Sequence, residues 1–260
     1  MAFIDLDGAR FHYRLDGPAE APVLLLSNSL GTDLGMWSAQ LPAWSRRFRV
    51  LRYDTRGHGR SAVTSGPYTI DRLGGDALAL LDALALPRVH FCGLSLGGMT
   101  GMWLATHAPA RIDRLVLSNT AAQIAPPELW NARIDAVDKG GMAAIANAVL
   151  ARWFTAPFLA AGGAVLAAMR EMLLACPAQG YMAACAAVRD TDQRAAVARI
   201  TAPTLVIAGT DDLATPPAAG RFLAGAIPGA RYAELPAAHI ANIEQPERHT
   251  ELVRRFLAGE

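Results

Sequence analysis

The sequence predicts an α/β protein with a mostly parallel sheet flanked by helices, and two features support this fold class. Short apolar runs bounded by Gly, Pro or Asp recur along the chain, and helical patterns lie between several of them. Strands that alternate with helices form parallel sheets, and continuously apolar strands are typical of sheets covered on both faces. The 260 residues, 52% of them hydrophobic, are enough to bury the core of one large domain.

Apolar runs identify the predicted strands. Five of them are expected to be buried parallel strands: PVLLLSNS (22–29), RVLRYD (49–54), RVHFCGLS (88–95), RLVLSNT (114–120) and PTLVIAGT (203–210). A further strand-like pattern, RYAEL, covers residues 231–235. Between the second and third runs, apolar residues recur every three or four positions from Ile70 to Leu86, which indicates an amphipathic helix.

The alternation of strands and helices fails in one long segment. From about residue 121 to 199 the sequence has no strand pattern, only Ala-rich helical stretches interrupted by prolines. No Gly/Ser-rich linker flanks this segment, so we expect a lid on the same core rather than an independent domain. The predicted division is a core of residues 1–120 and 200–260 with an inserted helical cap of residues 121–199.

Charge and composition limit the classes of partner. With 24 basic and 23 acidic side chains the net charge is +1, so no overall field favours nucleic acid or an anionic membrane. Charged residues, glycines and a proline interrupt the Ala-rich region 141–175 before it could span a membrane. We therefore expect a small-molecule partner, with no nucleic acid and no membrane, and the oligomeric state is left open.

The cysteines and the N-terminus bear on the cellular compartment. Cys92, Cys176 and Cys185 are odd in number, lack CxxC spacing and lie in apolar surroundings, so they are expected to be reduced core thiols. Charged residues interrupt the first fifteen residues, where a signal peptide would need an apolar stretch. Together these observations favour a cytoplasmic protein without structural disulfides.

A candidate nucleophile, Ser95, lies in the GxSxG pattern of residues 93–97, directly after a predicted strand and before a helical run. At such a turn the serine adopts a strained conformation that exposes its hydroxyl, and small neighbours prevent collisions. The following helix N-terminus favours negative charge on an attacked carbonyl oxygen, so the Leu96 amide is a candidate oxyanion donor. The alternative is an ordinary Gly-rich turn between strand and helix.

A serine nucleophile needs a histidine base oriented by a carboxylate. His239 follows the last strand pattern and precedes the last helix, where a loop can carry it to the strand ends. His58, in the loop sequence RGHG, is its rival. The remaining histidines lie in strand-like or helical segments and are expected to be structural or exposed: His12, His90, His107 and His249.

The acid is expected at the end of an earlier strand. Asp211 and Asp212 directly follow the run 203–210, and loop placement makes either carboxylate available. The alternative is that these residues only cap the helix that follows Pro216.

With these residues placed, the chain resembles the α/β-hydrolase superfamily, and more narrowly the 3-oxoadipate enol-lactonases, nearly end to end. The chain order Ser, Asp, His is that of the superfamily. The segments that carry the resemblance are SNSLGTDLGMW (27–37), RYDTRGHGRS (52–61), FCGLSLGGMTGMW (91–103), LVLSNTAAQI (115–124), ARWF (151–154) and LVIAGTDDLATPP (205–217). The resemblance implies an α/β-hydrolase fold with a mostly parallel eight-stranded sheet and an inserted helical cap.

The resemblance also implies roles for particular residues. The family pattern GxxDxxxP matches Gly209, Asp212 and Pro216, which selects Asp212 as the acid, and RGHG is a frequent superfamily loop, which makes His58 architectural. The Leu30 amide becomes the second oxyanion donor. Asn28 and Ser29 stand where most members have His-Gly, and their side chains have no assigned role.

In the cap, the segments WNARI (130–134) and ARWF are similar to those of enol-lactonases. The expected substrate-binding residues are Arg133, for a substrate carboxylate, together with Trp130 and Trp153. The alternative for Arg133 is an exposed arginine paired with Glu128 or Asp135.

The resemblance implies hydrolysis of 3-oxoadipate enol-lactone, a small anionic lactone, to 3-oxoadipate in the β-ketoadipate pathway of bacterial aromatic catabolism. No metal or organic cofactor is expected. The alternatives are a general carboxylesterase, a carbon–carbon bond hydrolase or a perhydrolase on the same fold, and a ligand-sensing protein that keeps the fold without turnover.

Overall fold

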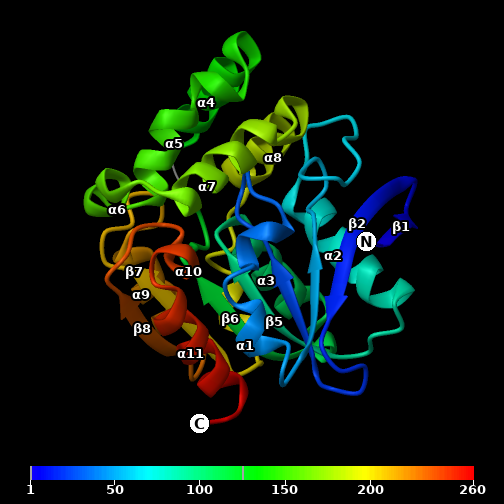
Figure 1. Ribbon diagram of the computed structural model, residues 1–260. Coiled ribbons are helices and arrows are strands. Elements are labelled where there is room, and N and C mark those ends of the chain that lie inside the picture. The colour runs from blue at the N-terminus through cyan, green and yellow to red at the C-terminus, as the bar shows by residue number, and fades with distance from the viewer. Residues whose placement is uncertain (1, 125) are drawn as a thin grey trace.

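The computed structural model of the chain describes residues 2–124 and 126–260, and it contains an eight-stranded sheet flanked by helices (Figure 1). The spatial order of the strands is β1-β2-β4-β3-β5-β6-β7-β8. Their bounds are β1 Ala2–Leu6, β2 Ala9–Asp16, β3 Val23–Ser27, β4 Arg49–Tyr53, β5 Val89–Leu94, β6 Ile112–Ser118, β7 Thr204–Gly209 and β8 Arg231–Leu235. The predicted eight-stranded, mostly parallel sheet is confirmed.

The antiparallel pairings involve the two N-terminal strands: β2 is antiparallel to both β1 and β4, and the other described pairings are parallel. Both N-terminal strands contain exposed as well as buried residues, as antiparallel strands with one solvated face do. A search for continuous apolar runs does not find such strands. By contrast, every residue of β5 and β7 is buried.

The parallel strands bring their carboxyl ends to one edge of the sheet. The register pairs Leu94 of β5 with Ser118 of β6, and Ser118 in turn with Ile207 of β7. Gly209 at the end of β7 pairs with Leu235 at the end of β8. The loops that leave these four strands therefore begin close together, which is where ligands bind in open α/β sheets.

Among the described residues between β6 and β7 there are five α-helices and no strand. They are α4 Pro127–Gly140, α5 Ala146–Trp153, α6 Ala156–Ala161, α7 Ala164–Ala175 and α8 Ala178–Asp190. Figure 1 shows them gathered at one end of the molecule, away from the C-terminus. This is the helical segment that the sequence predicts.

The remaining α-helices are associated with the sheet and its loops. They are α1 Leu41–Trp44, α2 Ile70–Ala83, α3 Leu96–His107, α9 Pro217–Ala226, α10 Ala241–Glu244 and α11 Pro246–Leu257. The expected helix from Ile70 ends at Ala83, three residues earlier than its apolar pattern. In the described part of the chain, no helix combines the length and apolar character needed to cross a bilayer. All three cysteines are free and buried.

Candidate active site

Ser95 occupies the turn between β5 and α3 with φ 57° and ψ −115°, a conformation that L-residues rarely adopt. Its amide donates to the Ser118 carbonyl at 3.0 Å, and the Thr120 hydroxyl donates to the Ser95 carbonyl at 2.7 Å. A Cβ atom on Gly97 would overlap the backbone of Ser27, so the turn requires glycine there. The neighbouring backbone thus holds Ser95 in its strained conformation, as the GxSxG pattern predicts.

Asp212 and His239 form a buried pair at the same edge of the sheet. Asp212 Oδ2 lies 2.8 Å from His239 Nδ1. Asp212 Oδ1 accepts the backbone amides of Ala214 and Thr215 at 2.8 Å each, and the Thr215 hydroxyl donates to Oδ2 at 2.7 Å. These bonds fix the carboxylate. The imidazole therefore has a defined orientation, with Nδ1 toward the acid.

The environment keeps Asp212 ionised. Burial alone would raise its pKa, but the charge of His239 and the hydrogen bonds from His239 and Thr215 outweigh that effect and lower the pKa to about 2. The adjacent Asp211 is exposed and accepts a hydrogen bond from its neighbour Thr210. The structure thus brings Asp212, and not Asp211, to His239.

Asn119, at the end of β6, is a buried polar residue that the sequence analysis did not single out. Its Nδ2 lies 3.1 Å from Asp212 Oδ2 and 3.1 Å from the Ala238 carbonyl oxygen. One amide group therefore links the loop after β7 to the loop that carries His239. Its position near the end of the run 114–120 is the available signal, because polar residues at the carboxyl ends of strands lie at the edge where ligands bind.

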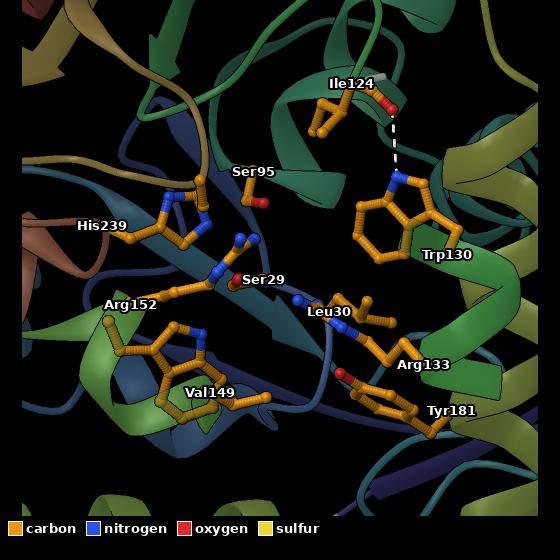
Figure 2. Close-up of a pocket in the computed structure, with 12 residues that line it drawn as sticks. Ser29, Leu30, Ser95, Ile124, Trp130, Arg133, Val149, Arg152, Tyr181 and His239 are labelled. Atoms are coloured by element: carbon orange, nitrogen blue, oxygen red, sulfur yellow. Dashed lines mark hydrogen bonds between the residues drawn. The ribbon is translucent and has the colours of Figure 1, made fainter. Parts of the chain in front are cut away.

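Ser95 and His239 both line a pocket of about 470 Å³, mouth included. Figure 2 shows the imidazole ring turned toward Ser95 and side chains of the helical segment closing the opposite side. The lining residues are Ser29, Leu30, Ser95, Ile124, Trp130, Arg133, Val149, Arg152, Trp153, Tyr181, Ala214 and His239.

The two candidate oxyanion donors lie close to this pocket. Leu96 is the first residue of α3, so its amide has no acceptor within the helix. Leu30 lines the pocket in the loop after β3. Asn28 braces that loop, because its side chain donates to the Tyr53 carbonyl at 2.7 Å and accepts from Trp37 Nε1 at 2.9 Å. Ser29 lines the pocket, and no hydrogen bond of its hydroxyl occurs among the described residues.

Arg133, Trp130 and Trp153, the expected substrate-binding residues, all line the pocket. The Arg133 guanidinium lies 4.8 Å from the Trp130 ring centroid, and Trp130 Nε1 donates to the Ile124 carbonyl at 2.9 Å. Within the described ranges, Arg133 forms no ion pair with Glu128 or Asp135. The geometry therefore differs from that of an exposed, paired arginine.

Two further pocket residues escaped the sequence analysis. Arg152 precedes Trp153 in α5, and Tyr181 is a buried residue of α8. The motif ARWF contains Arg152, but sequence alone does not show which of its side chains faces the pocket. No aspartate or glutamate of the described chain lines the pocket, so its two arginines are not neutralised there.

The other histidines lie outside this pocket. His58 is fully buried and its Nδ1 lies 3.1 Å from the Arg56 carbonyl oxygen, and burial lowers its pKa. His12 pairs with Asp54 at 2.7 Å, and His249 Nε2 lies 3.2 Å from the Ser118 hydroxyl. None of them occupies a position from which it could serve Ser95 in the pocket.

Taken together, the pocket contains a serine in a strained backbone conformation and a histidine held by an ionised carboxylate, and the first amide of α3 lies next to that serine. These are the groups that nucleophilic hydrolysis of an acyl bond requires.

Comparisons with known proteins identify the class. The family model of the alpha/beta hydrolase fold matches residues 22–155. The chain is 42% identical over 246 residues to 3-oxoadipate enol-lactonase 2 of Acinetobacter baylyi, covering 95% of this chain and 92% of that protein. The chain belongs to the α/β-hydrolase family, and it is a hydrolase.

Two solved structures extend the comparison. The crystal structure of the enol-lactonase from Burkholderia xenovorans LB400 is 49% identical, with a TM-score of 0.98 over 99% of this chain and all of that one. A thermophilic esterase from Thermogutta terrifontis, bound to malate, is 28% identical with a TM-score of 0.93, over 100% of this chain and 99% of the esterase. The similarity to the first structure includes the helical segment between β6 and β7.

Proposed function

We propose that this hydrolase converts 3-oxoadipate enol-lactone to 3-oxoadipate through an acyl-enzyme on Ser95. Two relatives with 42% and 39% identity are 3-oxoadipate enol-lactonases, and a third, of known structure, is an enol-lactonase. The observation that carries the proposal is that Arg133 lines the Ser95 pocket, whose described lining contains no acidic side chain. A neutral ester would require no cation there, whereas an anionic lactone has a carboxylate for it.

In the proposed acylation step, Ser95 Oγ attacks the lactone carbonyl carbon while His239 takes the serine proton. Asp212 holds the imidazole tautomer and stabilises the imidazolium that forms, and the amides of Leu30 and Leu96 donate to the oxyanion. Collapse of the tetrahedral intermediate breaks the bond between the carbonyl carbon and the ring oxygen. The electron pair stays on that oxygen, which receives the proton from His239.

In the proposed deacylation step, a water molecule attacks the acyl carbon while His239 accepts its proton, and the bond to Ser95 Oγ then breaks. The leaving group of a lactone remains tethered to the acyl chain and could attack back. Ketonisation of the enol removes that nucleophile and makes ring opening irreversible. In this mechanism the participating groups are three side chains, two backbone amides and water.

We also propose that residues 121–199 act as a cap over the core formed by residues 1–120 and 200–260. Support comes from the pocket lining, because Trp130, Arg133 and Trp153 of the helical segment face Ser95 and His239 of the sheet edge. The kinship to 3-oxoadipate enol-lactonases supports a role in the β-ketoadipate pathway, which we expect to be cytoplasmic.

The test is a comparison of kcat/KM values for the enol-lactone and for a series of small neutral esters. We expect the lactone to be the better substrate by at least about tenfold, since a single bond to a charged group contributes roughly 1.5–3 kcal/mol. Equal or faster turnover of the neutral esters would instead assign the enzyme as a general carboxylesterase.

A further inference from the structure

The pocket contains two arginines, whereas the proposed lactone has a single carboxylate. Arg133 of α4 and Arg152 of α5 both line it, and neither has an ion-pair partner in the described part of the chain. Other arginines of the helical segment have polar partners on its outer surface. Arg170 donates a hydrogen bond to Asn147 at 2.7 Å, and Arg189 forms an ion pair with Asp190 at 2.7 Å. One pocket cation therefore remains to be explained.

The two arginines approach the pocket from different sides. Figure 2 shows the guanidinium group of Arg152 directed toward Ser95 and His239, whereas Arg133 lies with Trp130 and Tyr181. The end of α5 is fixed beside the histidine loop, because the Ile240 amide donates to the Trp153 carbonyl at 3.0 Å. Arg152 thus belongs to the end of the pocket where bonds would be made and broken.

This location separates Arg152 from Arg133, to which the proposed function assigns the substrate carboxylate. The carbonyl carbon of the lactone must lie against Ser95 for attack, so the carboxymethyl group extends away from Ser95. Negative charge appears at the Ser95 end only during the reaction. As the acyl carbon–oxygen bond breaks, its electron pair moves onto the ring oxygen, which becomes an enolate until it is protonated.

We propose that Arg152 stabilises the negative charge on this departing oxygen. The inference deepens the proposed function, since it takes the lactone as the natural substrate. A cation whose negatively charged partner develops only in the transition state accelerates bond cleavage more than it tightens substrate binding. Arg152 is half-buried, so solvent screens its interaction with the departing oxygen less than it would on the surface. The described pocket lining also contains no acid that would neutralise the guanidinium charge.

The test uses neutral phenyl acetates, whose substituents change the basicity of the leaving oxygen from 4-nitrophenyl (weakly basic) to 4-methoxyphenyl (strongly basic). We expect Arg152→Gln to lower kcat/KM about ten- to a hundredfold for 4-methoxyphenyl acetate, by analogy with loss of one electrostatic donor, and far less for the 4-nitrophenyl ester. The plot of log kcat/KM against leaving-group pKa becomes steeper. Arg152→Lys, which keeps the charge, should recover part of the original slope.

The matched control is Arg170→Gln, which removes a charge from the outer surface of the helical segment and should leave the whole series unchanged. A uniform loss across the series in Arg152→Gln, with wild-type thermal stability, would show that Arg152 only supports the pocket and would overturn the inference. An unchanged series would overturn it as well. The esters contain no carboxylate and no lactone ring, so this test does not depend on the proposed substrate. If Arg152→Gln gave the steeper slope but the wild-type enzyme did not hydrolyse the lactone, the proposed substrate would be rejected and the role of Arg152 would stand.

Discussion

Among single residues, Ser95 is the one on which the proposed mechanism depends first. We expect Ser95→Ala to lower kcat roughly a million-fold, as loss of a triad nucleophile can, because no other hydroxyl in the pocket is held in a strained turn beside His239. Ser29→Ala is the control, since its hydroxyl also faces the pocket. Steady-state hydrolysis and circular dichroism check both variants. Near-normal turnover by a folded Ser95→Ala enzyme would eliminate the mechanism.

The choice between adjacent aspartates gives a second residue-scale prediction. We expect Asp212→Asn to lower kcat about 10⁴-fold, as in the best-studied triad, because an amide at this position favours the wrong tautomer of His239. Asp211→Asn should have little effect, since Asp211 is exposed and bonded to Thr210. Single-turnover acylation measures both. A greater loss in Asp211→Asn would mean that the acid is wrongly assigned.

The residues of the site differ in how far sequence could predict them. Local motifs and chain order predict Ser95, Asp212 and His239, and the structure places Asp212 against His239 and lines one pocket with Ser95 and His239. Asn119, Arg152 and Tyr181 were not predictable, because their positions depend on how distant segments pack: Asn119 spans two loops, and the arginine and tyrosine enter from separate helices. Single-sequence patterns contain no information on such contacts.

At the scale of elements, α8 packs against the loop after β4 through two glycines. A Cβ atom on Gly180 would overlap the Gly57 backbone, whereas one on Gly75 in α2 would meet nothing within 4 Å. Gly180→Ala should therefore lower both Tm and activity, because α8 must move and Tyr181 moves with it. Gly75→Ala should stabilise the protein by about 0.5–1 kcal/mol, as helix propensity predicts.

Chemical denaturation and kinetics of the two variants check this prediction. Both substitutions replace a helical glycine with alanine, so the intrinsic helix preference of alanine contributes equally to each. The difference between their effects on the free energy of unfolding therefore measures the contact between Gly180 and Gly57. Equal stabilisation by both changes would show that α8 does not depend on its close approach to Gly57.

The elements also show what periodicity can and cannot predict. The apolar runs of β3 to β7 were predictable because these strands are buried on both faces, and the helix from Ile70 followed from its spacing. The N-terminal hairpin of β1 and β2 is absent from the predicted apolar runs, because Ala9, Phe11, Tyr13 and Leu15 of β2 alternate with polar residues and form no continuous run.

At the scale of the whole molecule, buried histidines should make stability depend on pH. Burial lowers the pKa of His249 from 6.5 to about 3, so between these values the unfolded chain binds a proton that the folded chain does not. The free energy of unfolding is therefore highest above about pH 7 and falls as pH falls through this window. At pH 5 the contribution of His249 is a loss of about 2 kcal/mol.

Urea denaturation at pH 8 and pH 5 measures this effect. Between pH 8 and pH 5, the free energy of unfolding of His249→Gln should fall by about 2 kcal/mol less than that of wild type, whatever the absolute stability of the variant. Burial also lowers the pKa values of His58 and His90, so part of the pH dependence should remain in the variant. An identical pH dependence in both proteins would contradict a buried, neutral His249.

The proposed function requires the Ser95 pocket to bind an anionic lactone through Arg133. The most direct test measures kcat/KM for the enol-lactone and for its neutral methyl ester, with wild type and with Arg133→Leu. We expect wild type to prefer the anion by about ten- to a hundredfold, from a contact of roughly 1.5–3 kcal/mol. Arg133→Leu should abolish that preference and leave the neutral ester within about threefold of wild type. Equal losses on both substrates would mean that Arg133 supports the helical segment, and an absent preference in wild type would contradict the proposed function itself.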